Sequence, residues 1–179
     1  ATVPPGVFRE TTKELLMNQQ FRRDLWVKGS PRLKITEQLQ LLRAHRFVMS
    51  AAREHMPKEM NCNLGTAALQ ENLYKPLYDL FDQYKQAPLS LGQIIDALQS
   101  QGQSQAAIVQ SVAVLVTLGG LSLVQSEEAT KAALPVTQRL NHYLIERAAH
   151  RPEVAQLASP VTGTAVGVQQ LLQLFLLAR

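Results

Sequence analysis

The stretch PLSLGQIIDALQSQGQSQAAIVQSVAVLVTLGGLSLV, residues 88–124, decides the fold because it marks where two helices begin and end. Ser90 stands before an apolar run and Gln93 follows three residues later, which is the capping-box pattern of a helix N-terminus. Gly102 is of the residue type that most often ends a helix. The spacing therefore predicts a helix that starts after Ser90 and stops before Gly102.

A second helix and a strand follow in the same stretch. Ser104 precedes the run AAIVQSVAVLVTL and can cap its first turn. Gly119-Gly120 interrupts the run, and LSLVQ after it predicts a strand. Upstream, Pro76 suits the first position of a further helix, and apolar residues recur on one face after it: Leu77, Leu80, Phe81 and Tyr84. Three short helices and then a strand are the order of a winged helix-turn-helix.

The residues after this strand do not read as a compact wing. A helix is expected over 136–151, and ASPVTGTAVGV, residues 158–168, predicts a hairpin that turns at Thr162-Gly163. The last segment, residues 168–178, predicts a strongly apolar helix. A helix with so many apolar residues is expected to pack on something.

The N-terminal part predicts a smaller helix and strand unit. A helix is expected over 8–18, with Thr11 or Thr12 as its cap, and another after Thr36. RFVMSAAR, residues 46–53, reads as a short strand that stops before Pro57. FRRDLWVKG, residues 21–29, has the alternation of a strand, with polar side chains and the single Trp on one face: Arg22, Asp24, Trp26 and Lys28.

Charge and turn residues divide the chain into two expected parts. Of the 18 Lys and Arg residues, 11 precede residue 60, and turn residues cluster over 61–72. We therefore expect an α+β unit over residues 1–65 and a winged-helix-like helical domain with short strands and an inserted helix over 66–179. The expected fold class is α+β, mainly α.

Composition limits the compartment and the site chemistry. The net charge is +4, which permits an anionic partner without demanding one. Cys62 is the sole cysteine, so an internal disulfide and a cysteine-based zinc cluster are excluded, and a reducing cytoplasm is expected. The N-terminus lacks the apolar region of a signal peptide, and the apolar run 112–124 is too short to span a bilayer.

Nucleic-acid binding is the first hypothesis that a winged helix raises. The third helix of that fold enters the major groove, yet here it offers Gln105, Gln110, Ser111 and Thr117 and no Lys or Arg. A basic arm around Arg22 is the other candidate, but its strand face holds one aromatic residue, whereas a stacking platform usually holds several. An interface strand is the favoured interpretation, because Trp and Arg are typical anchors of protein interfaces.

Metal and catalytic sites have weaker signals. His142, Glu146 and His150 recur every four residues but offer too few converging ligands for zinc, and an exposed helical face is the favoured interpretation. His45 and His55 read as ordinary histidines. No base or oxyanion site is visible for Cys62. The pair Asp79 and Asp82 is expected on a solvated face, and no glycine-rich phosphate motif is present.

The run NQQFRRDLWVKGSPRLKITEQLQLLRAHRFVMSA resembles the methyltransferase regulatory domain of bacterial class I S-adenosylmethionine-dependent methyltransferases, which include protein lysine methyltransferases. The match covers about residues 18–57, and the second part more loosely resembles the winged-helix region that follows in such proteins, through LYDLFDQY and LGGLSLV. The residues that carry the match are Phe21, Arg22, Arg23, Lys28, Gly29, Glu37 and Phe47.

The resemblance implies a non-catalytic region that serves regulation, substrate recruitment or dimerisation, and the chain is expected to be a fragment of a longer methyltransferase. The catalytic domain and its S-adenosylmethionine are expected upstream, and no cofactor, metal or catalytic residue is assigned here. The expected partners are that domain, a protein substrate or a second copy, with no membrane. The expected interaction surface is Arg22, Arg23, Trp26 and Lys28, and the alternative function is a nucleic-acid-binding winged helix.

Overall fold

The computed structural model describes residues 6–18, 28–29, 33–62, 65–151 and 153–177. They form an α+β fold in which helices predominate, which confirms the expected fold class. The helices α3 (Glu71–Gln83), α4 (Leu91–Gln99) and α5 (Gln105–Thr117) and the strand β5 (Leu121–Leu123) follow the order that the sequence predicts, and a short strand that was not predicted, β4 (Leu89–Ser90), lies between α3 and α4.

A three-stranded antiparallel sheet joins the N-terminal part to this helical part. Strand β1 (Arg46–Met49) lies in the middle, with Phe47 opposite Leu89 of β4 on one side and opposite Leu123 of β5 on the other. Phe47 and Met49 also belong to the same core cluster as the helices α3, α4 and α5. The sheet and the core therefore include residues from both sides of the boundary expected at residue 65.

The caps of α4 and α5 form as the sequence predicts. The backbone N–H of Gln93 donates to Ser90 Oγ at 3.1 Å, and the N–H of Ser90 donates to Gln93 Oε1 at 2.8 Å. At α5 the N–H of Ala107 donates to Ser104 Oγ at 3.2 Å. The largest core side chains with almost no exposure come from these helices and their strands: Leu77, Phe81, Leu89, Leu91, Ile94, Ile95, Leu98, Ile108, Leu115 and Leu121.

Two expectations about α3 need correction. The helix begins at Glu71, so Pro76 lies inside it and is not its first residue. Tyr84 follows the helix as its C-terminal cap and is exposed, whereas Leu77, Leu80 and Phe81 are buried as predicted. Pro76 has no N–H to donate to the carbonyl of Asn72, four residues earlier, and the side chain of Gln103 donates to that carbonyl instead, at 3.4 Å.

Helix α2 (Ile35–Ala44) begins one residue before the predicted cap Thr36. Its N-cap is Lys34, whose backbone N–H donates to the Glu37 carboxylate at 2.9 Å. An ion pair joins this helix to α4: Arg43 Nη2 lies 2.8 and 2.9 Å from the two carboxylate oxygens of Asp96. Such charge-assisted pairs fix orientation, here that of α2 across α4.

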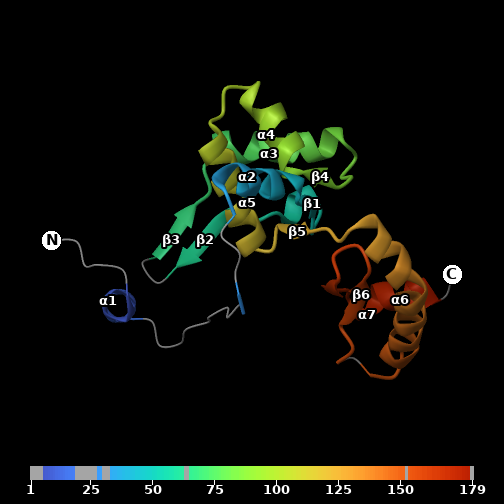
Figure 1. Ribbon diagram of the computed structural model, residues 1–179. Coiled ribbons are helices and arrows are strands. Elements are labelled where there is room, and N and C mark those ends of the chain that lie inside the picture. The colour runs from blue at the N-terminus through green and yellow to red at the C-terminus, as the bar shows by residue number, and fades with distance from the viewer. Residues whose placement is uncertain (1–5, 19–27, 30–32, 63–64, 152, 178–179) are drawn as a thin grey trace.

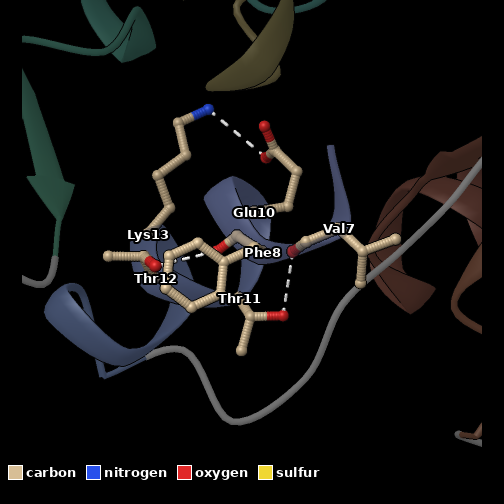
Figure 2. Close-up of polar contacts among 6 residues, drawn as sticks. All are labelled: Val7, Phe8, Glu10, Thr11, Thr12 and Lys13. Atoms are coloured by element: carbon tan, nitrogen blue, oxygen red, sulfur yellow. Dashed lines mark hydrogen bonds and ion pairs between the residues drawn. The ribbon is translucent and has the colours of Figure 1, made fainter. Parts of the chain in front are cut away.

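Helix α1 (Val7–Leu16) follows Gly6 rather than a threonine cap. Figure 2 shows why the expectation for Thr11 and Thr12 was wrong: their hydroxyls donate back to the carbonyls of Val7 and Phe8, at 3.0 and 2.7 Å. None of the ten residues of α1 is buried. In Figure 1 this helix lies on the opposite side of the molecule from α6.

A hairpin occupies the segment that the sequence assigned to a boundary. Strands β2 (Glu59–Cys62) and β3 (Gly65–Ala68) pair antiparallel, after the single turn η1 (Arg53–His55). Gly120 packs against this connection, since a Cβ there would come within 2.9 Å of the Pro57 ring. Only glycine fits at this close approach without movement of its neighbours.

The C-terminal elements form a separate group in Figure 1: α6 (Glu127–Ala148), β6 (Gln156–Ser159), β7 (Thr164–Gly167) and α7 (Gln170–Leu177). The predicted hairpin is confirmed, because Ser159 pairs with Thr164 across the turn and Gly163 has φ of 67°. The predicted start of α6 was wrong. It begins nine residues earlier, after the cap Ser126, and runs through Pro135.

None of the helices in the described ranges is both long and apolar enough to cross a membrane.

Candidate interaction surface

The interaction surface expected from the sequence falls mostly outside the described residues. Arg22, Arg23 and Trp26, and the strand that would carry them, belong to the part of the chain that the structure does not describe. Lys28 is exposed in a turn with Gly29, whose φ of 67° is one that glycine adopts without strain. The proposed role of this surface therefore stays a prediction.

Helix α5 presents an uncharged face to solvent. Its exposed positions are Ala106, Gln110, Ala113 and Thr117, and Ser111 is buried in the core. A groove-reading helix needs cations for phosphates, because neutralising phosphates supplies most non-specific affinity. The exposed side of α5 has none to offer.

The acid pair on α3 has a partner that the sequence did not reveal. Arg53, from η1, contacts Asp79 through one guanidinium nitrogen and Asp82 through the other, each at 2.5 Å. The hydrogen bonds that Arg53 donates to Asp82 and Asp79 raise the pKa of Arg53 above its ordinary value. The two carboxylates therefore hold η1 against α3 through their ion pairs with Arg53.

The remaining candidates from the sequence do not converge. His142 and Glu146 form an exposed pair at 3.4 Å, and no group of three His, Cys, Asp or Glu side chains gathers among the described residues. His45 and His55 are exposed, at the end of α2 and in η1. Cys62 is the last residue of β2.

The C-terminal group of elements is fastened together by side-chain amides. Asn141, on α6, makes two bonds to Ala158 of β6: its Nδ2 donates to the carbonyl at 2.8 Å, and its Oδ1 accepts from the N–H at 2.7 Å. Gln170, at the start of α7, donates to the carbonyl of Ala148 at 2.7 Å. These bonds fix the hairpin and α7 to α6.

Helix α7 is turned so that its polar side faces inward. Gln173 is 0% exposed, and its Nε2 donates to the carbonyls of Val154 and Val168, both at 2.8 Å. Among the eight residues of α7, Gln173 alone is buried. The two carbonyls would otherwise lack this donor, so the amide stabilises α7 in this orientation.

The apolar side of α7 consequently faces solvent. Four large side chains share this outward side, and the most exposed is Phe175, at 67%: Leu171, Leu172, Phe175 and Leu176. They lie on one side because residues three and four apart in a helix are neighbours. The sequence predicted that this helix packs on something, yet the described residues leave these four side chains uncovered.

A second apolar stripe runs along α6. Val136, Leu140 and Tyr143 are exposed at intervals of four and three residues. Tyr143 and Leu177 line the same open hollow of about 630 Å³ at the C-terminal ends of α6 and α7. Contiguous exposed apolar surface of this kind marks interaction sites in soluble proteins.

Sequence reasoning found the apolar character of α7 but not its orientation. The signal was present in Gln170 and Gln173, which share one side while the four apolar residues share the other. A pattern of this kind shows that the helix has two unlike sides. It does not show which side faces inward, because that depends on the acceptors supplied by Ala148, Val154 and Val168.

Comparisons with known proteins add one relative. The chain is 30% identical over 177 residues to the uncharacterized protein sll1526 of Synechocystis, which covers 99% of this chain and 34% of that protein. The chain thus spans about a third of the length of the curated relative it matches. No family model matches the chain. No solved structure matches it either.

Proposed function

We propose that this chain is a non-catalytic accessory region of an S-adenosylmethionine-dependent methyltransferase, and that it docks on the catalytic domain of the same protein. The proposal rests on the resemblance of residues 18–57 to the methyltransferase regulatory domain. No residue of this chain is assigned to the methyl donor, which would bind the catalytic domain. The chain's own contribution is to bind and position.

The observation that carries the docking role is the orientation of α7. A helix that buries Gln173 and exposes Leu171, Leu172, Phe175 and Leu176 presents apolar surface that the described residues leave uncovered. Each large side chain covered by a partner contributes about 1.5–3 kcal/mol of transfer free energy if it becomes fully buried. This surface is therefore the expected centre of the docking contact.

The relative supports a partner within the same polypeptide. In Synechocystis sll1526 the matching region is 34% of the protein, so the part of that protein outside the match is about twice as long as the match. A catalytic domain fits within that length, because single domains most often have about 100–150 residues. A domain on the same chain also binds at high effective concentration, so a modest apolar surface suffices.

The test titrates the 179-residue chain against the separately produced catalytic domain of the parent methyltransferase. Calorimetry measures the binding of the two proteins. The rate of methyl transfer is measured separately, with labelled S-adenosylmethionine. We expect saturable binding and a changed methyl-transfer rate. Phe175→Asp combined with Leu171→Asp should weaken binding at least about tenfold, because two charges would be buried at the contact.

The matched control is Leu41→Asp, at an exposed leucine on α2, which should leave binding unchanged. Absence of both binding and any effect on methyl transfer would refute the proposal. A salt series with duplex DNA examines the alternative expected from the sequence. Affinity that falls steeply with salt would favour nucleic-acid binding instead.

A further inference from the structure

We propose that the chain forms a homodimer through an antiparallel pairing of helix α6 with α6 of a second copy. Six residues of α6 recur at intervals of four, three, four, three and four, which is the heptad repeat of a coiled-coil seam: Ala129, Ala133, Val136, Leu140, Tyr143 and Arg147. The repeat runs through five of the six turns of this 22-residue helix.

The seam is open to solvent. Val136, Leu140 and Tyr143 are 59%, 45% and 51% exposed, Ala129 is exposed as well, and Ala133 and Arg147 are half-buried. The helix attaches to its own hairpin through a different side, where Asn141 bonds Ala158. The apolar seam is therefore available to a partner without disturbing those bonds.

The sizes of the seam residues indicate a second copy as the partner. The N-terminal half of the seam carries two alanines, and the C-terminal half carries the larger Leu140, Tyr143 and Arg147. In an antiparallel pair centred between Val136 and Leu140, small faces large in every layer. Ala129 meets Arg147 of the second copy, Ala133 meets its Tyr143, and Val136 meets its Leu140. Such a surface is self-complementary, as a twofold interface requires.

Charge complementarity favours the same arrangement. The first turn of α6 carries Glu127 and Glu128, of which Glu127 also contacts Arg46 at 3.4 Å, and the last turn carries Arg147 beside Glu146. Antiparallel pairing sets the acidic end of each helix beside the basic end of the other, so opposite charges meet at both ends. A parallel pair would instead bring like charges together.

Tyr143 is already held in place for this contact. Its hydroxyl accepts a hydrogen bond from Arg147 Nη1 at 2.6 Å, and the guanidinium carbon lies 5.5 Å from the ring centroid. A side chain that is ordered before binding loses less entropy on association. The ring is thus ready to pack over Ala133 of the second copy.

The expected affinity is modest. At 1.5 Å per residue the helix is about 33 Å long, and a contact about 10 Å wide along it covers less than the roughly 800 Å² per partner of a standard interface. Arg139 lies beside the seam near the twofold axis, so the two copies of Arg139 repel each other. We expect a dissociation constant in the micromolar range.

The test measures self-association of the full 179-residue chain by sedimentation over a wide range of concentrations. We expect a monomer–dimer equilibrium that Leu140→Glu weakens at least about tenfold. The control is Leu134→Glu, at a leucine that is 42% exposed on the same helix but off the seam, and it should have no effect. A chain that stays monomeric at the highest concentration would overturn the proposal, as would a dimer that Leu140→Glu leaves intact.

A size exchange tests the register itself. Ala133→Phe alone should weaken the dimer, because the added ring meets Tyr143 of the second copy, and Tyr143→Ala alone should weaken it by leaving a void. The double variant restores the small-against-large layer, so we expect the dissociation constant to return towards the original value. Additive losses in the double variant, with helix content unchanged by circular dichroism, would contradict this pairing.

A substitution at Arg139 tests the position of the twofold axis of the proposed dimer. Arg139→Glu should self-associate no better than the original chain, since two glutamates also repel. A mixture of this variant with the original chain should form heterodimers in preference to either homodimer, which native mass spectrometry would show. Random mixing would refute the placement of Arg139 at the axis.

Discussion

Helices α4 and α7 are both rich in large apolar residues, yet α4 buries its apolar side and α7 exposes its own. α4 buries its apolar side, with Leu91, Ile94, Ile95 and Leu98 in the core. α7 buries Gln173 and leaves Leu171, Leu172, Phe175 and Leu176 exposed to solvent. The difference teaches that burial depends on what surrounds a helix. Helix α4 packs against α2, α3 and α5. Among the described helices, α7 packs closely against α6 alone.

The largest expected loss of stability comes from a substitution in the core to which α4 belongs. Phe81→Ala removes a fully buried ring and should lower the free energy of unfolding by about 3–5 kcal/mol, because a cavity remains. Leu172→Ala on the outward side of α7 should change it by less than about 0.5 kcal/mol. Chemical denaturation of both variants measures the contrast. Equal losses would mean that the side of α7 described as exposed is in fact packed.

The second effect concerns what holds α7 in its orientation. Gln173→Leu removes the donor to the carbonyls of Val154 and Val168 and should weaken the docking of α7 by about 1–3 kcal/mol. Hydrogen exchange of the α7 amides reports this local opening. Gln138→Leu, at an exposed glutamine of α6, is the matched control. Greater protection in Gln173→Leu would show that α7 prefers to bury its apolar side.

The smallest expected change in stability concerns helix N-caps. Here a predicted cap that forms is compared with a predicted cap that does not. Ser90→Ala removes the acceptor for the Gln93 N–H and should cost about 1 kcal/mol in the free energy of unfolding. Thr36→Ala should stay within about 0.5 kcal/mol, because Lys34 is the N-cap of α2. Thermal unfolding of the two variants gives the comparison. A larger loss in Thr36→Ala would contradict the observed start of α2.

Predictions succeeded where the signal and its effect lie within a few residues of each other. The caps at Ser90 and Ser104 and the hairpin turn at Gly163 all depend on bonds or dihedral angles that span at most five positions. Predictions failed where a local signal had two outcomes. Pro76 and Pro135 are tolerated inside helices, and the hydroxyls of Thr11 and Thr12 bond to preceding carbonyls.

The candidate site could be predicted only in part. The apolar character of the last helix and the amphipathic pattern of α6 are visible in the sequence. The inward turn of α7 is not, because Gln173 Nε2 donates to carbonyls whose positions follow from the path of the chain through Val154 and Val168. The expected surface around Arg22 lies outside the described residues and stays a prediction.

The sequence by itself determined the order of the helices, the caps of α4 and α5 and the α+β class, because neighbouring residues settle these through short-range bonds. The tertiary structure alone decided that β1 enters the sheet between β4 and β5, that Arg53 joins Asp79 to Asp82, and that α7 faces outward. The first two contacts join residues about 26 to 75 positions apart along the chain. No local pattern encodes such pairs, since they form only when the whole core is in place.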